Sequence, residues 1–98
     1  MLTVAIKESS SGRLLVITDS SLLGKRFEEG RKQLDLTKVF YQGEEQSAEK
    51  IRKIIMTAKH LHFTGKEAVA LGIELDLIAS THILYVQKIP HAEVVMSE

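Results

Sequence analysis

The sequence contains no cysteine at all. This absence excludes disulfide bonds, a thiolate nucleophile, and zinc or iron–sulfur sites that depend on cysteine ligands. The sequence also lacks any apolar run near the roughly 18 residues of a membrane-spanning helix, so we expect no membrane association. The first residues have neither the basic region nor the long apolar region of a signal peptide, and we therefore expect a cytoplasmic protein.

The sequence has no excess of either charge, because 13 Lys and Arg residues balance 13 Asp and Glu residues. Dedicated nucleic-acid-binding proteins usually carry a basic excess, so this balance argues against that class while leaving room for a local basic patch. Its 98 residues are 44% apolar and 27% charged, as in an ordinary globular domain. A chain of this length buries one modest core, so we expect a single domain over residues 1–98.

Alternating or apolar segments at the two ends of the chain predict β-strands. Residues 2–7 alternate between apolar and polar, and residues 13–18 are almost continuously apolar. The small polar residues between these segments favour a turn, so we expect a β-hairpin. Further strands are expected over 33–37, 82–87 and 92–96. The only proline, Pro90, should separate the last two of these strands, because it has no N–H to donate to a neighbouring strand.

Two helices are expected between the terminal strands. Ser47 is a good N-cap for a helix that runs to about Lys59 with one apolar face. Thr64 and Glu67 form a capping box, which predicts a second helix that is apolar almost all round. Residues 60–63 could extend the first helix or form a joint. The fold class we predict is α+β, with a mostly antiparallel sheet from the N- and C-terminal strands and two helices packed on one face.

Four separate blocks of the sequence carry a family resemblance. They are Leu22-Leu23-Gly24-Lys25-x-Phe27-x-Glu29-Gly30, Phe40-Tyr41-x-Gly43, Gly65-Lys66-x-Ala68-Val69 and Ile89-Pro90-His91-Ala92-x-Val94-Val95. Over nearly its whole length the chain resembles the archaeal domain-of-unknown-function family four-two-four. The resemblance implies an archaeal, cytoplasmic, single-domain protein. It supplies no reaction, ligand or catalytic residue.

Residues 18–30 break every simple periodicity and are the most distinctive stretch of the chain. Asp19 is suited to cap a single helical turn that Gly24 would end. Backbone N–H groups near Gly24, together with Lys25 and Arg26, could surround a phosphate. The segment does not match the GxxxxGK[ST] phosphate-binding loop, and the two glutamates that follow would repel an anion. An ordinary structural loop is the stronger interpretation.

The histidines are the other candidate functional side chains. His60 and His62 would share a face only on a strand, and a metal site would need a third ligand from elsewhere, so we expect no metal site. His91 could act as a general base or a polar contact, with Glu29 or Asp35 as its first possible partners. No catalytic residue and no cofactor can be assigned from this pattern.

A local basic surface is the remaining candidate binding site. Arg52 and Lys53 belong to a predicted helix with no acidic residue between Lys50 and Lys59, and they could contact RNA phosphates with help from Lys25 and Arg26. A charge run of this kind is more often a solvated helix face.

These observations predict a non-enzymatic binding module, with RNA or a ribonucleoprotein as the first candidate partner. The candidate binding residues are Lys25, Arg26, Arg52, Lys53 and His91. One alternative is a small enzyme, or an anion- or ligand-binding protein, that uses the segment from Leu22 to Gly30 and His91. Another is a homodimer formed through the apolar second helix.

Overall fold

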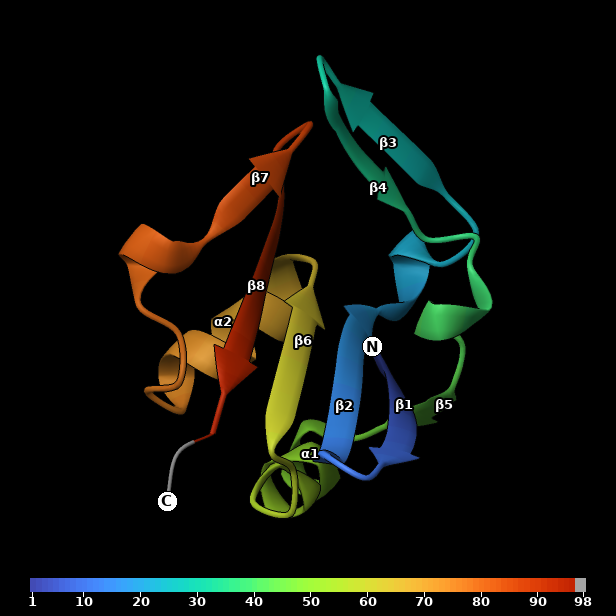
Figure 1. Ribbon diagram of the computed structural model, residues 1–98. Helices are drawn as coiled ribbons and strands as arrows, with labels where there is room; N and C mark the ends of the chain where they lie inside the picture. The colour runs from blue at the N-terminus through green and yellow to red at the C-terminus, as the bar shows by residue number, and fades with distance from the viewer. Residues whose placement is uncertain (97–98) are drawn as a thin grey trace.

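A six-stranded sheet forms the centre of the protein, and the computed structural model describes residues 1–96. The order of its strands is β5-β1-β2-β6-β8-β7. Their bounds are β1 (Leu2–Ser9), β2 (Gly12–Asp19), β5 (Glu44–Gln46), β6 (His60–Thr64), β7 (Leu84–Val86) and β8 (Ile89–Val95). Neighbouring strands are antiparallel except for β2 and β6, which run parallel (Figure 1). The predicted α+β fold with a mostly antiparallel sheet is confirmed.

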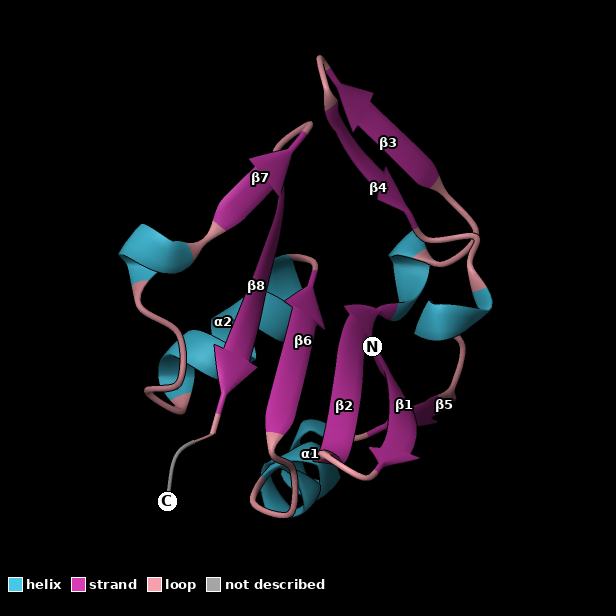
Figure 2. Cartoon of the chain, viewed as in Figure 1, coloured by secondary structure: helices cyan, strands magenta, loops and turns pink. Residues whose placement is uncertain are grey.

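Two helices, α1 (Ala48–Ile55) and α2 (Lys66–Glu74), lie behind one face of the sheet in Figure 2, as predicted. Ser47 is the N-cap of α1, and its side chain accepts a hydrogen bond from the backbone N–H of Lys50 at 3.1 Å. Apolar side chains from both helices pack with the inward-facing residues of β2 and β6 to form the main core. Neither helix is long and apolar enough to span a membrane.

A second hairpin, β3 (Arg26–Glu29) and β4 (Lys32–Asp35), projects from the end of the sheet where β2 and β6 finish (Figure 1). Its apolar residues pack on the face opposite the helices, in a cluster that also contains Val16 of β2 and Val86 of β7. Within the residues that the structure describes there are also three short 3-10 helices, at Ser20–Leu22, Val39–Tyr41 and Ser80–His82. Part of this second face remains uncovered and carries the candidate site.

Several local predictions are wrong, each for a physical reason. Thr64 does not cap the second helix, because it belongs to β6 and Gly65 takes the N-cap position. Residues 60–63 are part of a central strand, since β2 and β8 pair with them on both sides. Pro90 lies inside β8, because the chain turns at Gln87 and Lys88 and the pairing of β8 with β6 begins only at His91. Its carbonyl accepts the N–H of Gly65 at 2.8 Å. The first helix ends before Lys59, through turns that follow Ile55.

Candidate functional site

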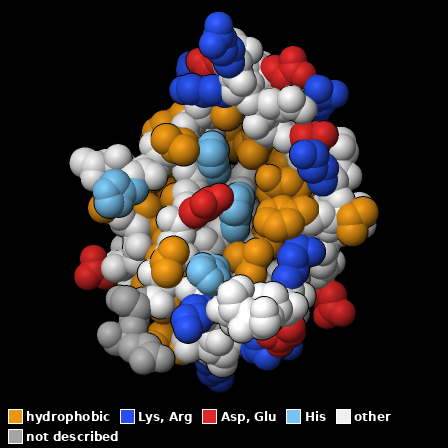
Figure 3. Space-filling view, viewed as in Figure 1, with side chains coloured by type: hydrophobic (Ala, Val, Ile, Leu, Met, Phe, Trp, Pro, Cys, Tyr) orange, Lys and Arg blue, Asp and Glu red, His pale blue; other side chains and the backbone are white. Residues whose placement is uncertain are grey.

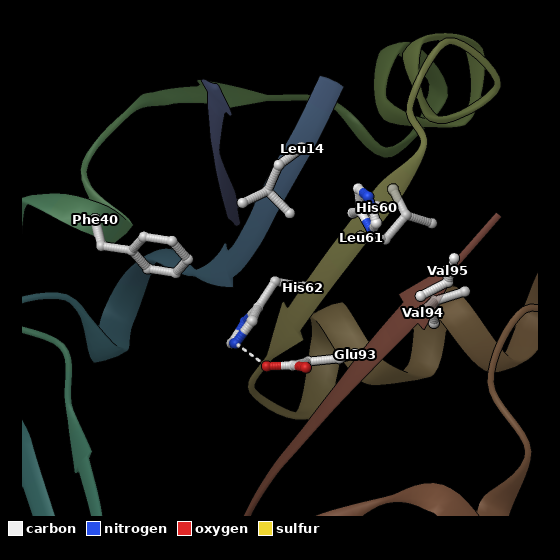
Figure 4. A pocket seen from close by; sticks show the side chains of 8 residues that line it. All are labelled: Leu14, Phe40, His60, Leu61, His62, Glu93, Val94 and Val95. Carbon is white, nitrogen blue, oxygen red and sulfur yellow. Dashed lines mark ion pairs between the residues drawn. The ribbon is translucent and has the colours of Figure 1, made fainter. Parts of the chain in front are cut away.

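An open groove of about 270 Å³ lies on the uncovered part of the sheet. Its walls come from β2, β6, β8 and the 3-10 helix Val39–Tyr41, as the close-up in Figure 4 shows. The lining residues are Leu14, Phe40, His60, Leu61, His62, Glu93, Val94 and Val95. On this side of the molecule, histidine side chains gather around an acidic side chain, with apolar surface beside them (Figure 3).

Strand alternation puts the histidines on this face. Leu61 and Phe63 point into the main core beneath the helices, so His60 and His62 must point to the opposite side of β6. The strand arrangement, which the sequence left open, therefore brings both histidines to one surface. The antiparallel register of β6 and β8 then pairs His62 with Glu93, a residue 31 positions later that sequence reasoning missed.

His62 and Glu93 form the polar centre of the groove. His62 Nε2 lies 3.4 Å from Glu93 Oε1 (Figure 4). Burial lowers the pKa of His62, although the Glu93 carboxylate acts in the opposite direction. The carboxylate beside Nε2 favours the neutral tautomer that carries its proton on Nε2, and this tautomer leaves Nδ1 as an acceptor. The Glu93 side chain is 78% exposed, so its carboxylate can also accept a hydrogen bond from a ligand.

Phe40 supplies the aromatic wall of the groove. Its ring meets the rings of Tyr41 and His62 edge to face, with centroid separations of 5.1 and 5.6 Å. Lys7 Nζ lies 5.3 Å from the Phe40 centroid, within the range of a cation–π contact. The groove thus combines a flat apolar surface with a hydrogen-bonding edge. A planar ligand could pack on Phe40 while its edge meets His62 and Glu93.

The basic residues singled out in the sequence do not form one surface. Lys25 and Arg26 are exposed at the start of the second hairpin, where Arg26 pairs with Glu28 at 3.0 Å. Arg52 and Lys53 are exposed on α1, on the other side of the sheet, and Arg52 forms an ion pair with Glu74. The sheet therefore separates the two basic segments.

The segment from Leu22 to Gly30 is not a single loop, because it contains the end of a 3-10 helix, a turn and all of β3. His91 on β8 faces the same side of the sheet as the groove, and its partner in the register is Thr64. Burial is the main cause of its lowered pKa, with a smaller contribution from the charge of Lys32.

Within residues 1–96, neither Glu29 nor Asp35 forms a hydrogen bond with His91. Glu29 accepts the backbone N–H of Gln87 at 2.7 Å, and Asp35 accepts hydrogen bonds from Thr37. The Thr37 hydroxyl is the largest cause of the lowered pKa of Asp35. Within the part of the chain that the structure describes, no group of three or more His, Asp or Glu side chains could hold a metal ion.

The family resemblance is supported by comparison with known proteins. A family model described as "Protein of unknown function (DUF424)" matches residues 7–96. The chain is also similar to a solved structure described as "Crystal structure of an uncharacterized conserved protein from Methanopyrus kandleri", with 20% identity and a TM-score of 0.76. That match covers 99% of this chain and 94% of the other and shows a shared fold. No curated protein matches this chain by sequence.

Proposed function

The chain belongs to the DUF424 family, whose description assigns no activity, and we propose that it is a non-enzymatic binding module for RNA or a ribonucleoprotein. An unpaired base would occupy the groove between Phe40, His62 and Glu93. Proteins that read RNA sequence mostly bind unpaired bases, which stack on aromatic or histidine rings and form hydrogen bonds along their edges.

The observation that carries this proposal is the meeting of an aromatic wall and an exposed carboxylate in one groove. The Phe40 ring offers a stacking surface, and Glu93 can accept the amino or imino N–H groups that guanine, cytosine and adenine present. A volume of about 270 Å³ is small for a ligand pocket and suits one planar ring system better than an extended molecule.

The phosphate contacts would come from the same side of the molecule. Lys7 lies beside Phe40, and the hairpin that carries Lys25 and Arg26 packs on the same face. Arg52 and Lys53 lie behind the sheet, so an RNA held in the groove would have to pass around the molecule to reach them. The two surfaces suggested for RNA can therefore be tested separately.

Fluorescence anisotropy with labelled single-stranded oligoribonucleotides, at low and moderate salt, tests the proposal. Phe40→Leu keeps an apolar side chain but removes the ring, and we expect it to weaken binding about tenfold, in line with a loss of 1–3 kcal/mol per stacked base. Glu93→Gln should change the preference among bases more than the overall affinity. Affinity should fall as salt rises, because phosphate contacts release counterions.

The matched control is the double variant Arg52→Glu and Lys53→Glu, which lies on the other side of the sheet. At moderate salt, where exposed charges farther away than a Debye length are largely screened, we expect it to retain binding within about twofold. If this variant loses binding while Phe40→Leu does not, the RNA contacts α1 and the groove assignment is wrong. If none of the oligonucleotides binds at low salt, RNA is rejected as the partner.

A second candidate function is a small-ligand site that uses His91 and the segment from Leu22 to Gly30, which is favoured because His91 lies on the side of the sheet where the β3–β4 hairpin packs. Such a site would use His91 and the adjoining hairpin rather than Phe40. Binding that is lost in His91→Gln but kept in Phe40→Leu would support this candidate over the groove.

A further inference from the structure

Three buried polar atoms within residues 1–96 have no hydrogen-bond partner. They are Thr18 Oγ1, Thr64 Oγ1 and His62 Nδ1. Both threonine side chains are fully buried, at 0% exposure. Buried polar atoms in native proteins almost always have a partner, which can be an ordered water or a ligand. Three such atoms therefore need a physical explanation.

The three atoms belong to neighbouring positions on one face of the sheet. The parallel register of β2 and β6 pairs Thr18 with Thr64, and adjacent strands are about 4.8 Å apart. His62 precedes Thr64 by two residues on β6, so their side chains share a face. Ile17 and Phe63, which alternate with them, point into the core beneath the helices. The three side chains that carry the unpartnered atoms are therefore neighbours on one face of the sheet.

The chemistry of these atoms selects the kind of group that could satisfy them. His62 Nε2 lies 3.4 Å from Glu93 Oε1, which favours the tautomer whose lone pair is on Nδ1, and that lone pair needs a donor. Each threonine hydroxyl can donate one hydrogen bond and accept others. A neutral O–H group can donate to Nδ1 while it exchanges hydrogen bonds with the hydroxyls, whereas a carboxylate has no proton to donate.

Two projecting hairpins lie at the end of the sheet where Thr18 and Thr64 are found, and their apolar residues pack on the same face. The hairpins β3–β4 and β7–β8 both extend beyond the ends of β2 and β6, and their tips approach one another (Figure 1). Gln87 joins them twice, since its backbone N–H donates to Glu29 Oε1 at 2.7 Å and its side-chain Nε2 donates to the carbonyl of Glu28 at 2.6 Å.

The turn that carries Gln87 is strained. Gln87 and Lys88 have φ angles of 48° and 66°, in the left-handed region where hairpin turns favour glycine or asparagine. A glutamine is unfavourable there for the backbone, yet its side chain makes one of the two contacts between the hairpins. Strain at the point of contact indicates that the link has a role beyond closing the turn.

We propose that Thr18, Thr64 and His62 Nδ1 form an internal site for a neutral hydroxyl group, and that the β3–β4 hairpin, latched by Gln87, is the lid of this site. The hydroxyl group belongs either to water or to a small polyhydroxyl ligand. The internal site shares His62 with the groove but uses its buried Nδ1 atom, whereas a base in the groove would pack on Phe40 and meet Glu93. The Tm test of the two threonines therefore does not depend on the identity of the groove ligand.

Replacing each threonine with valine tests whether the site is occupied, because valine has nearly the same shape and no hydroxyl. With an occupant, Thr18→Val and Thr64→Val both lose hydrogen bonds and lower the Tm. Thr3→Val is the matched control, since the Thr3 hydroxyl is also buried and has a known partner in Ser20 Oγ at 2.7 Å. A higher Tm for both Thr18→Val and Thr64→Val, with a lower Tm for the control, would overturn the proposal.

The same measurement after refolding separates the two sources of the hydroxyl. Protein unfolded in guanidinium and refolded in plain buffer loses any co-purified ligand. If the valine variants still lower the Tm after refolding, the occupant is water. If their effect is present in the native preparation and disappears after refolding, the occupant is a ligand.

Hydrogen exchange tests the lid. Gln87→Gly removes the side-chain latch and relieves the strain, so we expect faster amide exchange in residues 26–35 and unchanged exchange in β1. Lys88→Gly is the matched control, because it relieves strain at the neighbouring position and leaves the latch in place. Equal exchange in residues 26–35 for both variants would show that Gln87 does not hold the hairpin closed.

Discussion

The carboxylate of Asp19, at the end of β2, accepts a hydrogen bond from the backbone N–H of Ala68 at 2.8 Å. Its second oxygen accepts the N–H of Glu67 at 3.1 Å. A strand residue 49 positions before Ala68 thus caps α2. This contact fills the positive end of α2, so an anion could bind there only by displacing a buried carboxylate.

Removing this cap should destabilise the protein. We expect Asp19→Ala to lower the free energy of unfolding by about 2 kcal/mol, because it leaves two backbone N–H groups without an acceptor. Asp19→Asn should cost less, since its amide oxygen can keep one of the two hydrogen bonds. Urea denaturation at neutral pH measures both variants. An unfolding free energy unchanged to within about 0.5 kcal/mol in Asp19→Ala would contradict the assigned role.

A neighbouring glycine should be equally sensitive, for a steric reason. Gly65 has a φ of 109°, and a Cβ added there would lie 2.2 Å from Asp19 Cγ. Gly24 has a φ of 81° and no atom within 4 Å of an added Cβ. Gly24→Ala should therefore cost only the backbone strain, about 1–2 kcal/mol. Gly65→Ala should cost clearly more in the same urea titration, because it also pushes the cap aside. Equal losses of unfolding free energy in Gly65→Ala and Gly24→Ala would show that Asp19 can move away from the added Cβ without cost.

The parts of the fold that could be predicted from the sequence are those set by local patterns. Alternation gave the β1–β2 hairpin, and the N-cap Ser47 with its apolar face gave α1. The parallel pairing of β2 with β6 has no local signal, because it joins residues about 46 positions apart, such as Thr18 and Thr64. The cap of α2 was missed for the same reason, since Thr64 and Glu67 suggest a local box whereas the acceptor comes from Asp19.

The candidate site could be predicted only in part. The alternation of His60 and His62 with Leu61 and Phe63 is a strand pattern that would have placed both histidines on one face. Glu93 has no distinguishing sequence context and reaches the groove only through the register of β6 with β8. Charge alone suggested one surface made of two basic segments, Lys25 with Arg26 and Arg52 with Lys53, although the sheet lies between these segments.

The titration of two histidines on the groove side of the sheet, His62 and His91, gives a pH dependence with a defined sign. Burial is the largest cause of the lowered pKa of His62 and of His91, and the Glu93 carboxylate partly opposes it in both. The unfolded chain has ordinary histidines, with a pKa of about 6.5. Below that pH the unfolded state binds protons that the native state does not. The free energy of unfolding should therefore be highest above about pH 6.5 and fall as the pH decreases toward 5.5.

Glu93→Gln separates the effect of burial on the pKa values of His62 and His91 from the effect of the Glu93 carboxylate. Removing the negative charge takes away the opposing effect, so the pKa of both histidines should fall further and the loss of stability on acidification should become larger. The double variant His62→Gln and His91→Gln should lose less stability over the same range than the parent. Urea titrations between about pH 7 and pH 5.5 exclude most carboxylate titration. A parent protein that gains stability as the pH falls through this window would mean that the attraction to Glu93 outweighs the cost of burying the two imidazoles.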